Sequence, residues 1–160
     1  ENKIKNVDIQ IVERIGNNSV VIHAEKKQRE KIRNAQYGFH LPLHAGSRGL
    51  ILLAFEKNDF IKNYLKQNLK KLTPETQINK VVIKQKIEEI QKLKIFFSVG
   101  DVQKHTASVA SPVFDENKNI LGCVCFVFLR KHYKDKEFLK NISEKIKIMT
   151  MKISSELGYK

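Results

Sequence analysis

Alternating apolar and polar residues near the start of the chain predict a β-hairpin. The segment Val7–Ile15 has the two-residue period of a strand with one buried face. Glycine and asparagine at positions 16–18 favour a tight turn because both tolerate positive φ, and a second strand is expected over Ser19–Ala24. The charged segment Glu25–Ala35 is only weakly periodic, which leaves a third strand and an irregular excursion both open.

Apolar residues spaced three and four positions apart predict four helices. The first is apolar on nearly every side, as expected of a buried helix, and it follows a loop that contains Ala45–Gly49. Thr73-Pro74 ends the second helix, because the residue before a proline disfavours helical backbone. Gly158 ends the last helix, which at about 33 Å is long enough to cross one face of a domain. The predicted helices are Leu50–Phe55, Asn58 or Asp59 to about Leu72, about Lys80–Leu93, and about Asp135–Leu157.

Three further strands are indicated in the second half of the chain, and a polar turn at residues 115–119 joins the last two. They are Ile95–Val99, Thr106–Phe114 and Ile120–Leu129. Two hairpins with helices between and after them are typical of the α+β class, in which an antiparallel sheet is flanked by helices. With 160 residues and no internal repeat or low-complexity linker, the chain is expected to form a single domain over residues 1–160.

The formal net charge of +13 raises the question of nucleic-acid binding, since a basic surface attracts phosphate. Most of the 30 basic residues are lysines, and they are spread along the whole chain instead of forming a compact stripe. Such a distribution is typical of a solvated surface. Direct binding of nucleic acid by this chain is kept as an alternative.

The two cysteines of the chain, Cys123 and Cys125, lie on one predicted strand at a spacing that rarely reaches disulfide geometry. We interpret them as core residues of a protein in a reducing compartment, which predicts a cytoplasmic location. No apolar run approaches the roughly 20 residues that span a bilayer, and the start is not a signal peptide. No membrane contact is therefore expected. The first residue is not methionine, so we expect a piece of a longer protein.

The residues able to carry chemistry do not form a catalytic motif. No spacing joins a nucleophile to a base or places two carboxylates together. The candidates considered are Ser47, Asp101, Ser108 and Cys125. His40 and His44 lie on either side of a proline, and no further metal ligands accompany them. We expect no enzyme activity, no metal and no cofactor, and a small-molecule enzyme is kept as the alternative.

Four short strings occur in order along the chain. The first leads into Gly49 and the apolar helix, the second separates two helices, the third follows Asp101, and the last closes the final helix. They are Tyr37–Ala45 (YGFHLPLHA), Leu72–Thr76 (LTPET), Ala110–Val113 (ASPV) and Ile153–Gly158 (ISSELG). In this order and spacing the chain, from about Val7 to Gly158, resembles the effector-binding domain of the IclR (isocitrate lyase regulator) family of bacterial transcriptional regulators.

The resemblance implies a GAF-like sensor domain that binds a small effector, often an organic acid, and forms a homodimer or tetramer. It also implies that DNA is read by a winged helix-turn-helix domain that precedes this one and is absent from the 160 residues. A GAF-like sensor or interaction domain of another signalling protein is the remaining alternative.

The same resemblance supplies the expected effector-binding residues. These are Ala45, Gly46, Ser47, Arg48, Gly49, Ser98, Asp101, Ser108, Cys125 and Val127. The sequence departs from the family pattern at several positions: Arg48 replaces a small residue, Leu50 replaces a lysine, His105 replaces a glycine, and Cys125 and Val127 replace polar residues.

Two aspects of this site can be argued from physical chemistry. Unpaired N–H groups at the start of the apolar helix would attract a carboxylate, and Gly46 and Gly49 would let that carboxylate approach the backbone. The alternative is that the two glycines only let the helix pack tightly against the sheet. Our hypothesis for Arg48 is a charge-assisted bond to an acidic effector. The alternatives are a surface arginine or one that fills and blocks the pocket.

Overall fold

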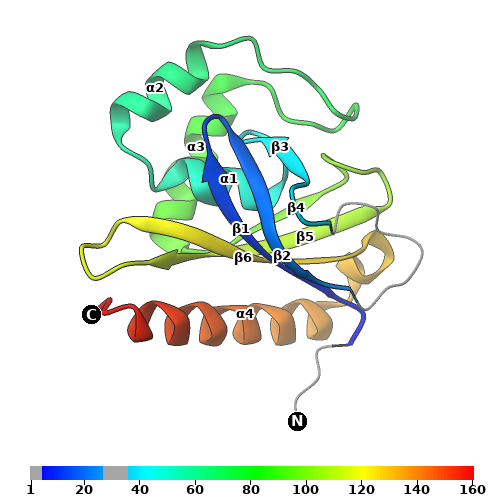
Figure 1. Cartoon of the computed structure of the whole chain (residues 1–160). Coiled ribbons are helices and arrows are strands. Elements are labelled where there is room, and N and C mark those ends of the chain that lie inside the picture. The colour runs from blue at the N-terminus through cyan, green and yellow to red at the C-terminus, as the bar shows by residue number, and fades with distance from the viewer. Residues whose placement is uncertain (1–4, 27–35) are drawn as a thin grey trace.

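The computed structural model describes residues 5–26 and 36–160 of the chain. Within these residues, six strands form one sheet in the order β3-β2-β1-β6-β5-β4, and every neighbouring pair is antiparallel (Figure 1). The strands are β1 Asp8–Ile15, β2 Asn18–Glu25, β3 His40–Pro42, β4 Phe96–Val99, β5 Thr106–Phe114 and β6 Ile120–Leu129.

Helices cover both faces of the sheet and give the described part of the chain three layers (Figure 1). Helices α1, α2 and α3 lie on one face, and the long helix α4 crosses the other. Asn79 and Asp135 begin α3 and α4 by accepting hydrogen bonds from N–H groups of the first turn. The helices are α1 Gly46–Ala54, α2 Asn58–Lys66, α3 Lys80–Leu93 and α4 Lys136–Glu156, and a short 3-10 helix, Arg130–Lys134, joins β6 to α4. The expected α+β class is confirmed.

Strand β6 shows how one sequence supplies two cores. Cys123, Cys125 and Val127 belong to the apolar cluster on the side of α1. Val124, Phe126 and Phe128 alternate with them and belong to the cluster on the side of α4. A strand buried on both faces reads as a continuous apolar run, and all nine residues of α1 are buried as well.

The structure differs from the sequence-based expectation in three elements. Helix α1 begins at Gly46, four residues before the expected start at Leu50, so most of the expected loop Ala45–Gly49 is helical. Strand β3, which pairs with the start of β2, lies in the segment expected to be a loop; its three residues are too few to show a period. Helix α2 ends at Lys66 instead of near Leu72, because the backbone of Gln67 is extended. Leu69 is still buried and lies four residues after Leu65, so the apolar spacing falsely indicated that the helix continues. Of the ambiguous segment Glu25–Ala35, residues 27–35 lie outside the described part.

Buried His44 holds the chain after α2 in this path. Its Nδ1 is 2.8 Å from the Tyr64 hydroxyl, and its Nε2 is 2.8 Å from the Lys70 carbonyl oxygen. Burial raises the pKa of Tyr64. With both ring nitrogens engaged, His44 serves the packing of α2 against the loop before α1.

Candidate functional site

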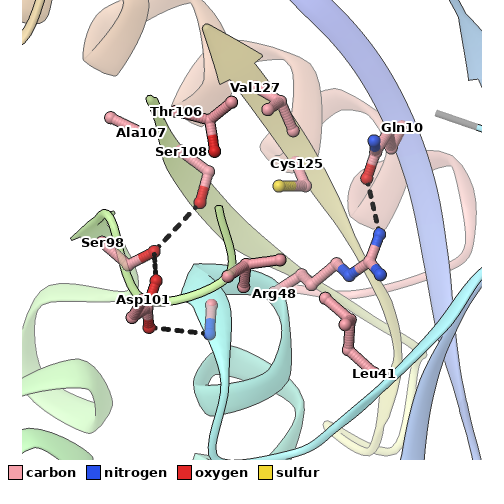
Figure 2. A pocket seen from close by; sticks show the side chains of 12 residues that line it. Gln10, Leu41, Arg48, Ser98, Asp101, Thr106, Ala107, Ser108, Cys125 and Val127 are labelled. Carbon is pink, nitrogen blue, oxygen red and sulfur yellow. Dashed lines mark hydrogen bonds between the residues drawn. The ribbon is translucent and has the colours of Figure 1, made fainter. Parts of the chain in front are cut away.

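A cavity lies between the start of α1 and the sheet, and it collects side chains from distant parts of the sequence (Figure 2). Its polar contributors are Gln10 from β1, Arg48 from α1, Ser98 from β4, Asp101 from the following loop, and Ser108 from β5. The cavity measures about 30 Å³. Such a space holds about two or three waters, so an organic molecule fits only after a side chain or loop in the wall shifts.

The predicted site residues divide into two groups. Those that line the cavity are Gly46, Arg48, Ser98, Asp101, Ser108, Cys125 and Val127. Ala45, Ser47 and Gly49 are buried without lining it. The hydroxyl of Ser47 lies 2.7 Å from that of Ser108 and supports the wall. A Cβ at Gly49 would lie 2.6 Å from the carbonyl oxygen of Leu43, so this glycine serves tight packing of α1.

Sequence reasoning missed part of the lining, namely Gln10, Leu41, Val102, Thr106 and Ala107. Gln10 interrupts the predicted strand Val7–Ile15 on its polar face, which in a half-buried strand would face solvent. In the structure Gln10 is fully buried. Gln10 could have been found by noting that helices cover both faces of the sheet, because a polar residue in a strand buried on both faces needs a hydrogen-bond partner inside the protein.

The N-terminus of α1 is already bonded by the protein itself. The N–H of Gly46 donates to Asp101 Oδ2 at 2.9 Å, and the N–H of Ser47 donates to Ser98 Oγ at 3.1 Å. Ser98 in turn donates to Asp101 Oδ1 at 2.9 Å. The carboxylate of Asp101 therefore occupies the place where the sequence argument put a ligand carboxylate, and its charge disfavours an anion at this end.

At the other end of the cavity Arg48 is buried with unused donors. Its side chain is only 4% exposed, and its Nη1 donates to Gln10 Oε1 at 2.8 Å (Figure 2). Among the described residues, neither Nε nor Nη2 of Arg48 has a hydrogen-bond partner, and no carboxylate forms an ion pair with it. The guanidinium also lies 5.3 Å from the ring centre of Phe39. A buried cation with unused donors favours an anion beside it.

The thiols beside Arg48 remain protonated. Burial raises the pKa of Cys123 well above its ordinary value, and burial also raises the pKa of Cys125. Burial lowers the pKa of Arg48, which is nonetheless charged at neutral pH. With Leu41 and Val127, Cys125 gives the cavity an uncharged wall between its cationic and anionic ends.

The loop that carries Asp101 is tied to the link between α2 and α3. Thr76 donates to the Asp101 carbonyl oxygen at 2.6 Å, and Thr73 donates to the Gly100 carbonyl oxygen at 2.7 Å. Arg130 pairs with Glu75 at 2.6 Å and lowers the pKa of that exposed carboxyl. The Leu-Thr-Pro-Glu-Thr string thus positions one wall of the cavity.

Other classes of site find no support in the described residues. No group of three histidine, cysteine, aspartate or glutamate side chains in residues 5–26 and 36–160 could hold a metal ion. Among the helices described, none has the length and apolar character needed to cross a membrane.

Comparison with known proteins places the chain in a family. The family described as bacterial transcriptional regulator IclR C-terminal matches residues 4–155. Among curated proteins, no sequence matches the chain.

Solved structures share the fold. The Thermotoga maritima IclR structure is 24% identical, with a TM-score of 0.89 over 96% of this chain and 62% of that chain. The Agrobacterium tumefaciens repressor BlcR is 15% identical, with a TM-score of 0.87 over 98% of this chain and 62% of its own. The C-terminal domain of the E. coli transcriptional regulator KdgR is 19% identical, with a TM-score of 0.84 over 97% of this chain and 90% of its own.

The chain thus spans about three-fifths of the first two proteins and most of the isolated C-terminal domain. The likeness confirms the GAF-like α+β fold that the resemblance implied. The match over residues 4–155 covers nearly the whole sequence. The chain therefore belongs to the family of IclR C-terminal domains of bacterial transcriptional regulators.

Proposed function

We propose that the chain is the effector-binding domain of a cytoplasmic transcriptional regulator, and that its effector is a small organic acid held by Arg48. The observation that carries the proposal is the buried guanidinium at the cavity, whose Nε and Nη2 have no partner among the described residues. These two donors lie on one edge of the guanidinium, which matches the two oxygens of a carboxylate. A bound carboxylate would also neutralise the buried charge.

The opposite end of the cavity restricts the rest of the molecule. Asp101, Ser98 and Ser108 form a hydrogen-bonded group there, and Asp101 repels a second negative charge. A hydroxyl group that donates to these residues fits this end. The effector class is therefore a hydroxy acid with an apolar middle facing Cys125 and Val127.

A neighbouring fold supports this class. The inducer-binding domain of the Acinetobacter PobR transcription factor, solved as a double mutant in complex with 3-hydroxybenzoic acid, matches the chain with a TM-score of 0.72 and 17% identity. That ligand has a carboxylate and a hydroxyl on an apolar ring, the combination that the two ends of this cavity favour.

In the proposed regulator the domain acts by binding and not by catalysis. Burial raises the pKa of Cys125, the thiol at the cavity, which makes this residue a poor nucleophile. The effector shifts the population between two arrangements of a homodimer or tetramer. DNA is read by a winged helix-turn-helix domain that precedes this one in each subunit, and the shift changes the distance between these DNA-reading domains.

A thermal-shift and calorimetric screen of small acids tests the proposal. An effector at about 100 times its Kd should stabilise the domain by about 2.7 kcal/mol, which raises Tm by roughly 5–10 °C. Each acid is paired with its hydroxyl-free analogue and its amide. For a true effector, both the hydroxyl-free analogue and the amide should bind much more weakly than the acid itself.

Two arginine variants locate the binding. Arg48→Ala should abolish the shift, whereas Arg14→Ala, which removes an arginine paired with Glu56, should keep it. If the acid binds Arg48→Ala as tightly as the unchanged chain, Arg48 has no part in recognition. If no hydroxy acid shifts Tm, the effector class is wrong.

A further inference from the structure

A second and larger cavity lies beside the last residues of β5, between the C-terminal ends of α3 and α4. It measures about 460 Å³, which is within the usual size range of ligand sites. The cavity is bounded by the end of α3, by β5 and by the last turns of α4. Figure 1 shows this end of α4 beneath the sheet, far along the helix from its start.

The floor of this cavity is apolar and aromatic. The rings of Phe114 and Tyr159 stack with centres 5.2 Å apart. The polar groups of the floor are already bonded: the hydroxyls of Ser111 and Thr150 lie 3.0 Å apart, and Ser154 Oγ accepts from the N–H of Phe114. A ligand body therefore needs only apolar contact here, since it leaves no buried polar group without a partner.

The rim of the cavity is basic. Lys94, Lys147 and Lys160 line it, and no aspartate or glutamate is among its described lining residues. The ammonium of Lys94 lies 5.5 Å from the centres of both stacked rings and donates to the Tyr159 hydroxyl at 3.0 Å. The rim therefore complements an anionic group above an apolar body.

Lys94 has a further property that supports this role. It ends α3 in the left-handed region, with φ of 53°, where glycine is the usual residue. The lysine is strained there, and its side chain lies over the aromatic floor. The same surface of a second copy is a poor occupant of the cavity, because it would bring two lysine-lined rims together and like charges repel.

We propose that this cavity is a second ligand site, distinct from the one at Arg48, and that it takes an amphipathic carboxylate with a linear or aromatic apolar body. The carboxylate lies at the rim beside Lys94 and Lys147, and the apolar body lies over Phe114 against Met151. Met151 is 71% exposed and lines the cavity, so a ligand would cover apolar surface that is otherwise in water.

Methionine NMR of the full chain tests this directly, because the chain has two methionines. With methyl-labelled methionine, decanoate below its micelle-forming concentration should shift the Met151 signal saturably. Met149 packs against the core beneath the sheet and serves as the internal reference. Decyltrimethylammonium, which has the same tail and the opposite charge, should leave Met151 unshifted.

Three variants sharpen the test, with isothermal calorimetry of decanoate as the readout. Met151→Glu should abolish binding, whereas Ile148→Glu, an equally exposed position of the same helix that does not line the cavity, should not. Lys94→Gly removes the ammonium at a backbone position that glycine prefers, so the fold is kept. It should weaken binding about tenfold, the equivalent of one charge-assisted hydrogen bond.

The outcomes separate the two sites. Arg48→Ala should leave the Met151 shift unchanged, because that residue lines the other cavity. The proposal is overturned if decanoate does not shift Met151 or if the cation shifts it equally. It is also overturned if the Met151 signal changes with protein concentration instead, which would show a second copy in the cavity.

Discussion

The two faces of the sheet are built from the same strands but differ in how their buried polar groups are satisfied. On the α4 side, Ser111, Thr150 and Ser154 are buried, and each has a hydrogen-bond partner. On the α1 side, Arg48 is equally buried, yet two of its nitrogens have no partner among the described residues. The difference indicates a division of labour. The α4 side satisfies its buried polar groups within the fold, whereas under the proposed function the α1 side gives up stability to keep donors available for a ligand.

The largest effect is expected on the stable face. Phe126→Ala removes a fully buried ring from the cluster beneath α4 and should cost about 3–5 kcal/mol of unfolding free energy, measured by urea denaturation. Val127→Ala, its neighbour on the other face, should cost much less, because its side chain is smaller and borders a cavity. Equal losses would contradict the division between the faces.

A substitution at Arg48 is expected to raise the unfolding free energy instead of lowering it. Arg48→Met replaces a buried, incompletely bonded cation by an apolar side chain of similar length. The gain from removing the buried charge should outweigh the lost bond to Gln10 Oε1, so the domain should be stabilised by about 1 kcal/mol. Thermal unfolding without ligand is the measurement, and acid binding should be lost in the same variant. A lower Tm would show that the arginine is fully satisfied in the folded domain, and the comparison would fail.

A smaller loss is expected at Gly49. The Cβ of Gly49→Ala would meet the backbone of Leu43, which cannot rotate away, so α1 must shift, at a cost of about 1–3 kcal/mol. Chemical denaturation measures the loss. Ser47→Ala, two positions earlier in α1, is the control that shows whether any substitution in this turn lowers stability. A stable Gly49→Ala variant with weakened effector binding would instead make this glycine a ligand contact.

The smallest effect concerns pH and the Glu75–Arg130 pair. The hydrogen bond from Arg130 lowers the pKa of Glu75, so its stabilisation is present above the unfolded-state pKa and is lost as pH falls through the folded-state pKa. Glu75→Gln should therefore differ slightly from the unchanged chain at neutral pH and match it once the pH lies below the folded-state pKa of Glu75. A constant difference in unfolding free energy across this range would exclude the ion pair as its source.

The sequence predicted most of the fold because most elements are long enough to show a period. β5, β6 and α4 were found near their true ends. Strand β3 was too short to be recognised, and Leu69 prolonged the apparent period of α2 beyond its last turn. Both errors come from segments whose structure is set by tertiary contacts.

The sequence could indicate most residues of the candidate cavity but not the hydrogen bonds between them. Motifs placed Ser98 on a strand and Asp101 after it, and the structure brings both to one cavity with Arg48, which lies in α1 and not in the expected loop. The bond from Gly46 to Asp101 joins positions 55 residues apart, and such pairing has no local signal. Gln10 was missed because its environment depends on a helix that follows much later in the chain.

Asp101 gives the domain a mechanical property. One oxygen of its carboxylate holds the first N–H of α1, its backbone carbonyl is held by Thr76, and the same side chain forms part of the cavity wall. The central helix, the connector before α3 and the wall consequently share a single anchor. A molecule that drew Asp101 toward itself would therefore pull on all three together, and a change of atomic size at the cavity would reach whole elements.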